Sequence, residues 1–165
     1  MQVSLTSQIR MAVERRSHAA VDVLLRDARP TMYRLALAIV GRPDTAEDVT
    51  QEALIRASRS REKLRTVAEP AAWLRAIVVR CALTALARPR FDSQQDVASD
   101  ADPTEAMAVR MTLERLNPID RAVLALVHFE GLTYGEIALA LDIPVGTVAS
   151  RLHNAREAFR KEWRK

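Results

Sequence analysis

The chain has 165 residues, of which 48% are hydrophobic and 28% charged, enough apolar material to bury a core. Its single cysteine, Cys81, excludes an internal disulfide and a cysteine-ligated zinc site. Glycine is scarce, with four residues, while alanine, leucine and arginine are abundant, so we predict an all-helical protein. The net charge of +4 is compatible with a polyanionic partner but does not demonstrate one.

Charge is uneven along the chain and suggests how it is divided. Residues 1–90 carry 16 basic and nine acidic side chains, residues 91–103 carry four aspartates and no basic residue, and residues 104–165 carry nine basic and eight acidic side chains. We expect a tail or short helix at 1–17, a helical domain at 18–90, a flexible acidic linker at 91–103 and a second helical domain at 104–165. The first segment lacks the apolar block of a signal peptide, and no apolar run is long enough to span a membrane. We therefore expect a cytoplasmic protein that is not inserted in a membrane.

The first domain shows helical spacing of its apolar residues. The spacing predicts a helix over 21–28 that is interrupted by Pro30, and a second helix over 32–39 that ends at Gly41. A third helix is predicted from about Asp44 to Ser58. A fourth begins at Pro70, because proline is favoured at a first helical position.

The third predicted helix, DTAEDVTQEALIRA, has two different faces. Ala46, Val49 and Ala53 share the side that faces the core. The other side carries acidic, amide and aliphatic side chains: Asp44, Glu47, Asp48, Gln51, Glu52, Leu54 and Ile55. A solvated face explains Asp44, Glu47 and Asp48, because the helix dipole favours acidic side chains near the N-terminus. Aliphatic residues beside acids favour a protein-docking surface instead, and the helix alone leaves both interpretations open.

The loop before the fourth helix, and that helix itself, are basic. Candidate contacts for single-stranded nucleic acid are Lys63, Arg65, Trp73, Arg75, Arg80 and Arg88. Cations neutralise phosphates, and an unpaired base can stack on an aromatic ring. For Trp73 alone, a place in the core is the slightly better interpretation.

The second domain contains a helix-turn-helix pattern. Thr133 and Glu136 form a capping box before a short helix, and Asp142 to Pro144 make a tight turn. The helix that starts near Val145 buries one narrow apolar face. Its outer side carries Gly146, Thr147, Ser150, Arg151, His153, Asn154 and Arg156. A glycine tip and a helix N-terminus suit a phosphate, and these polar side chains can reach base edges in the major groove of DNA.

No pattern in the chain predicts an enzyme. The sequence has no P-loop or nucleophile motif, and its three histidines are scattered without partners at metal-ligand spacing. We therefore expect no catalytic residue, no metal and no cofactor.

Two segments together resemble the extracytoplasmic-function (ECF) group of bacterial sigma factors. LERLNPIDRAVLALVHFEGLTYGEIALALDIPVGTVASRLHNAR is similar to sigma region 4. RLALAIVGRPDTAEDVTQEALIRA is similar to region 2, and PAAWLRAIVVRCALTAL continues it. The resemblance covers about 130 residues in the order that the family has. It implies two small helical domains and a role in transcription initiation.

The resemblance also implies partners and places them. The helix with Asp44, Asp48 and Gln51 would dock on the β and β′ subunits of core RNA polymerase. The segment from Lys63 to Arg88 would hold the −10 promoter element as it melts, and the helix from Val145 to Arg156 would read the −35 element. An anti-sigma factor would be expected to hold the protein inactive.

The chain departs from the family pattern at a few positions. Val79-Arg80 and Thr84 stand where Arg-Asn and Asp are common, the following basic run is thinned to LARPR, and Ala149 replaces a common basic residue. These changes favour a weakened or tightly regulated promoter reader, a hypothesis that run-off transcription as strong as a typical family member's would contradict. Two alternatives remain from sequence: a helix-turn-helix regulator that never binds polymerase, and an inactive relative that only binds an anti-sigma factor.

Overall fold

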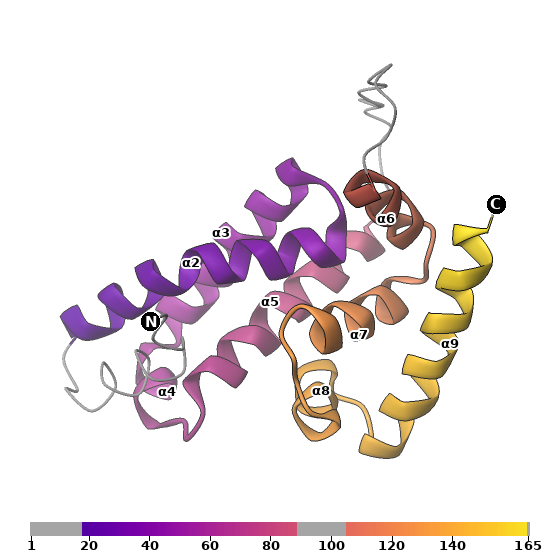
Figure 1. Ribbon diagram of the computed structural model, residues 1–165. Coiled ribbons are helices and arrows are strands. Elements are labelled where there is room, and N and C mark those ends of the chain that lie inside the picture. The colour runs from indigo at the N-terminus through magenta and orange to yellow at the C-terminus, as the bar shows by residue number, and fades with distance from the viewer. Residues whose placement is uncertain (1–17, 89–104, 165) are drawn as a thin grey trace, which may run out of the picture.

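The computed structural model describes residues 18–88 and 105–164, which form helices and contain no strand, so the predicted all-α class is confirmed (Figure 1). The predicted tail at 1–17 and linker at 91–103 lie outside the described residues. The helices are α2 (His18–Val40), α3 (Pro43–Arg59), α4 (Arg61–Thr66), α5 (Pro70–Ala87), α6 (Glu105–Glu114), α7 (Pro118–His128), α8 (Tyr134–Leu141) and α9 (Val145–Trp163).

Helix α2 corrects the prediction that Pro30 separates two helices, since it runs unbroken through this residue. Proline removes one backbone hydrogen bond, to the carbonyl four residues earlier. Pro30 and Arg26 are both exposed, so water can satisfy the freed carbonyl. Buried side chains on both sides of Pro30, among them Leu24 and Leu35, hold the two halves against one core. Gly41 ends the helix as predicted, with a positive φ of 80°.

Helix α3 begins and ends close to its predicted residues, α5 begins at Pro70 as predicted, and α2, α3 and α5 pack on one another. Ala46, Val49 and Ala53 are buried, as their spacing predicts. Helix α5 is long and apolar enough to cross a membrane by length and composition alone. Its place in the centre of the helical core explains that composition, because it is packed between α2 and α3 on one side and α8 on another.

The prediction that a loop joins α3 to α5 was wrong, because residues 61–66 form the short helix α4. Six residues are too few to form a stable helix in isolation. Leu64 is completely buried among residues of the main core, and this contact supplies the missing stability. A single buried leucine among charged neighbours gives little periodic signal, which is why the pattern of the sequence missed it.

The C-terminal helices follow the local signals of the sequence. The side chain of Asn117 caps α7 by accepting a hydrogen bond from the Ile119 backbone N–H at 3.0 Å. The predicted capping box at Thr133 and Glu136 is present at the start of α8. Asp142 ends α8 in the left-handed conformation, with φ 56°, which aspartate tolerates better than most residues. The helix-turn-helix α8–α9 is therefore built by its own capping residues.

The two halves of the chain share a core. Helices α7 and α8 lie against α2 and α5, while α9 lies on the far side of α7 and α8 (Figure 1). Buried Leu126 and Ile137 belong to the same apolar cluster as Leu35, Leu74 and Val78. A second, smaller cluster joins α7 to α9 through Val123, Leu124, Leu152 and Ala155.

Candidate functional site

The outer face of α3 presents most of the side chains predicted to dock a protein. Asp44, Asp48, Gln51 and Glu52 are exposed, and Ile55 keeps 46% of its surface accessible. Glu47 is partly buried, and Leu54 packs partly into the core. The face is therefore acidic toward the helix N-terminus and apolar toward its C-terminal half.

Several carboxylates of this face already have arginine partners. Asp44 pairs with Arg42 at 2.8 Å, Glu52 accepts from the Nε of Arg56 at 2.6 Å, and Glu47 pairs with Arg29. The side-chain hydrogen bond from Arg42, with that from the Thr45 backbone N–H, holds the pKa of Asp44 below its usual value. Asp48 makes no ion pair with any residue that the structure describes.

A groove of about 470 Å³ lies between α2 and α3, beside this face. Leu25, Leu54 and Ile55 give it an apolar lining, and Arg26, Arg29 and Arg59 give it positive charge. The sequence analysis did not single out the two α2 arginines. Arg26 and Arg29 are three residues apart, so the sequence could have predicted that they share one face of α2. Only the packing of α2 on α3 brings that face beside Ile55.

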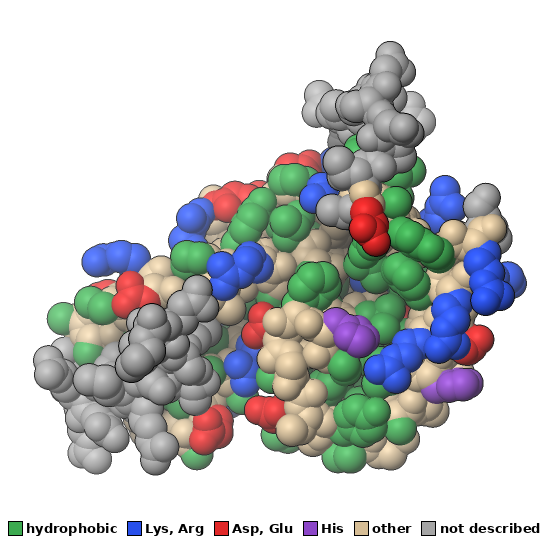
Figure 2. Space-filling model, viewed as in Figure 1, with side chains coloured by type: hydrophobic (Ala, Val, Ile, Leu, Met, Phe, Trp, Pro, Cys, Tyr) green, Lys and Arg blue, Asp and Glu red, His purple; other side chains and the backbone are tan. Residues whose placement is uncertain are grey.

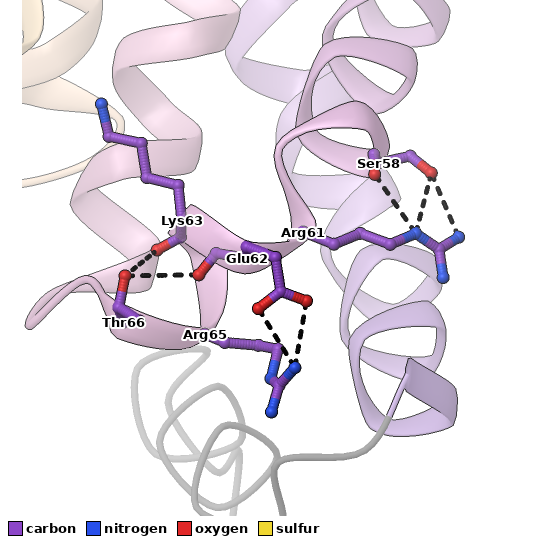
Figure 3. Close-up of polar contacts among 6 residues, drawn as sticks. All are labelled: Ser58, Arg61, Glu62, Lys63, Arg65 and Thr66. Carbon is purple, nitrogen blue, oxygen red and sulfur yellow. Dashed lines mark hydrogen bonds and ion pairs between the residues drawn. The ribbon is translucent and has the colours of Figure 1, made fainter.

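Helix α4 carries the first two residues of the predicted −10 set and orders its arginines by local contacts (Figure 3). Arg61 donates to the carbonyl and hydroxyl oxygens of Ser58 and pairs with Asp22 at 2.8 Å. Arg65 donates to both carboxylate oxygens of Glu62, at 3.0 and 3.2 Å. Lys63 is exposed and extends away from these pairs, so its charge is available to a partner.

The remaining residues of the predicted −10 set lie on or directly after α5, in different environments. Arg80 and Arg88 are exposed, while Trp73 is partly buried against the core, in agreement with the preferred interpretation of that residue. Arg75 points toward the C-terminal half and lies 3.8 Å from Glu136. Val79, where the family often has a charged residue, is completely buried and has no surface to offer to DNA.

Helix α9 presents its predicted polar residues on one outer face. Ser150, His153, Asn154 and Arg156 are exposed, whereas Val148, Leu152 and Ala155 on the opposite side are buried. Thr147 is partly buried, and the hydroxyl of Ser150 donates to its carbonyl oxygen at 3.0 Å. Gly146 is exposed, and a Cβ there would meet nothing within 4 Å, so space outside the helix tip is open.

Helix α9 carries more basic than acidic side chains, and its cations begin at Arg151. Figure 2 shows Lys and Arg side chains gathered along α9. Nη1 of Arg151 lies 3.6 Å from Oδ1 of Asp120 on α7. The Arg151 side chain is therefore directed toward α7 rather than away from the protein. Arg160 pairs with Glu157 one turn away. The N-terminal half of α9 therefore exposes polar side chains, and its remaining cations continue the positive surface.

A capped short helix, a tight turn and an amphipathic helix with a polar, basic outer face define a helix-turn-helix DNA-binding protein. The family model for "Sigma-70 region 2" matches residues 24–91, and that for "Sigma-70, region 4" matches residues 106–159. The RNA polymerase sigma-H factor of Pseudomonas aeruginosa is 34% identical over 171 aligned positions, covering 90% of this chain and 89% of that protein. The ECF RNA polymerase sigma factor SigM of Mycobacterium tuberculosis is 33% identical, covering 83% of this chain and 74% of that protein.

Among solved structures, the sigma factor RpoE of Bartonella quintana in complex with the anti-sigma factor NepR has a similar fold. It matches with a TM-score of 0.66 and 19% identity, covering 85% of this chain and 94% of that chain. The chain belongs to the ECF group of sigma factors. It is a transcription initiation factor that directs RNA polymerase to promoters, and a regulator that never binds polymerase is not favoured.

Proposed function

We propose that the outer face of α3 docks on the β and β′ subunits of core RNA polymerase. The observation that carries this proposal is an exposed aliphatic residue, Ile55, on the same helix as exposed Asp48 and Gln51. Protein interfaces combine an apolar centre with a polar rim, and burying Ile55 and the apolar lining of the α2–α3 groove would remove both from water. Asp48 would supply an unpaired charge for a basic partner residue.

The −35 element is read by α9 in the major groove. Asn154, Ser150 and His153 stand on its outer face, where their donors and acceptors can reach base edges. The open tip at Gly146 lets a backbone phosphate approach the first turn, where amide N–H groups and the helix dipole favour an anion. Arg156 adds a cation on the same exposed side.

The −10 element is held by α4 and the exposed side of α5. Lys63, Arg80 and Arg88 are exposed and can neutralise the phosphates of the strand that is held. Trp73 is only partly buried, so the exposed part of its ring is a candidate for stacking with an unpaired base. The buried Val79 gives this surface one cation fewer than family members with an arginine there, in line with a weaker or more tightly regulated promoter reader.

An anti-sigma factor is the regulatory partner, and the protein acts in the cytoplasm with polymerase. The similar structure from Bartonella quintana is itself a complex with an anti-sigma factor. Exposed apolar side chains on α6 and α9 of this chain, namely Met107, Met111 and Trp163, offer area that such a protein can bury. Trp163 is held in place by stacking on Phe159, with ring centroids 5.8 Å apart.

Co-elution with bacterial core RNA polymerase on size exclusion tests the docking proposal. The Asp48→Arg variant should lose co-elution, because the substitution places a cation where a basic partner residue is expected. Asp48 makes no described ion pair, so the fold should survive. The matched control is Glu69→Arg, an equal charge reversal at an exposed residue before α5. Failure of the unmodified protein to bind polymerase, or equal binding by both variants, would contradict the proposal.

A further inference from the structure

Two arginines of the predicted −35 set, Arg151 and Arg156, lie on α9 in different surroundings. Arg156 is exposed and makes no ion pair with any residue that the structure describes. Nη1 of Arg151 lies 3.6 Å from Oδ1 of Asp120 in the first turn of α7, and the Arg151 side chain is 38% exposed. Of these two cations, only Arg156 is therefore free to meet any phosphate that DNA brings near the helix.

The carboxylate of Asp120 is placed to hold the guanidinium group. Its side chain is only 16% exposed, and Oδ1 is buried and accepts no hydrogen bond from the described part of the chain. Removing a carboxylate from water is unfavourable unless a cation stays close to it. The separation is longer than a hydrogen bond, so attraction between the charges, rather than a directed N–H contact, draws Arg151 toward α7.

An apolar seam between α7 and α9 fixes the backbone positions of both residues. Leu152, directly after Arg151, is 2% exposed. Val123, about one turn beyond Asp120, is completely buried in the same apolar cluster. Neither helix can rotate about its axis without opening this cluster. The carboxylate therefore stands on the capped start of a packed helix, and the long side chain of Arg151 is the movable member of the pair.

We propose that Asp120 is a specificity-determining positioning residue, which holds Arg151 on the α7 side of α9 and withholds it from phosphates elsewhere. The inference rests on the proposed reading of the −35 element by α9. Contacts to phosphates position a protein on the duplex but carry no sequence information. An arginine that reaches many phosphates strengthens binding to every sequence alike. A held arginine adds affinity only where the recognition helix has docked in its correct register.

The size of the effect follows from the exposure of the pair. Ion pairs that are partly open to solvent are weak, and salt screens them further. Release of Arg151 should therefore change DNA affinity by a few-fold rather than by orders of magnitude. A released guanidinium neutralises up to one more phosphate, so the dependence of binding on salt should steepen by about one counterion.

Duplex binding by the full chain measures this effect. The two probes are a short randomised duplex pool and the duplex that the unmodified protein enriches most strongly from it. Asp120→Asn removes the charge at nearly constant size. Its affinity for the pool should rise about two- to fivefold, and the slope of log affinity against log salt should steepen by about one. Affinity for the enriched duplex should hardly change, so the preference for that duplex should fall about two- to fivefold.

Three further variants separate positioning from other roles of the carboxylate. Asp120→Glu keeps the charge and should keep the preference for the enriched duplex. Adding Arg151→Gln to Asp120→Asn should remove the gain on the pool. Glu105→Gln removes one exposed carboxylate on α6 and should behave like the unmodified protein, which controls for net charge.

The outcomes separate this inference from the proposed reading role of α9. Unchanged pool affinity in Asp120→Asn, weaker binding of both probes as a merely structural role predicts, or a gain that survives Arg151→Gln would each overturn the inference. If the unmodified protein enriches no sequence from the pool, the reading role of α9 fails and the inference fails with it. Enrichment of a sequence, followed by an unchanged preference in Asp120→Asn, leaves that role intact and removes the inference alone.

Discussion

Truncating Leu64 to alanine tests whether α4 is held by one buried side chain. Leu64 is completely buried, and it is the buried residue of a helix only six residues long. Substitutions of this kind in a core cost about 2–5 kcal/mol, and the free energy of unfolding of a domain is about 5–15 kcal/mol. We therefore expect the Leu64→Ala variant to remain folded but to lose about 3 kcal/mol, with α4 opening far more often than the helices around it.

Denaturant unfolding and amide hydrogen exchange measure these two effects. The exchange of the α4 amides should accelerate more than that of α5, because local opening of α4 no longer has to withdraw a leucine from the core. Lys63→Ala, its exposed neighbour, should change the free energy of unfolding by less than about 0.5 kcal/mol while weakening oligonucleotide binding. A loss below about 1 kcal/mol for Leu64→Ala, or uniform exchange in α4 and α5, would refute the reasoning.

Three further outcomes are expected. Hydrogen bonds from Thr133 lower the pKa of Glu136, so the stability they contribute is present above the ordinary glutamate pKa of 4.5 and lost as pH falls through the lower folded value. Thr133→Ala should cost about 1 kcal/mol near neutral pH and flatten the acid limb of a stability–pH profile. Gly41→Ala should lower the free energy of unfolding by about 1–3 kcal/mol, because φ is 80° and the Glu114 side chain occupies the space that a Cβ needs. Adding Glu114→Ala should restore the part of this loss that comes from the clash, but not the part that comes from the backbone conformation. Arg156→Ala should reduce the slope of log affinity for duplex promoter DNA against log salt by about one, as measured by a salt titration.

Local chemistry explains which features could be predicted from the chain alone. The starts of α3, α5 and α8 depend on a proline at a first position or a capping box, and these signals act within one helical turn. The outer face of α9 follows from the spacing of three buried residues, so the exposure of Asn154 and His153 could be predicted without neighbours. The family of the protein followed from the same segments.

Packing decided what local signals could not. Pro30 lies inside a helix because side chains before and after it reach one core, and α4 exists because Leu64 finds a buried site. Arg75, Val79 and Arg80 have similar sequence surroundings. Arg75 nevertheless faces Glu136, Val79 is buried and Arg80 is exposed. Periodicity specifies which side of a helix is apolar, whereas the environment of each side depends on which distant helix lies against it. That is why the sequence determined the helices and the recognition face, and the tertiary structure alone determined which cations remain available to DNA.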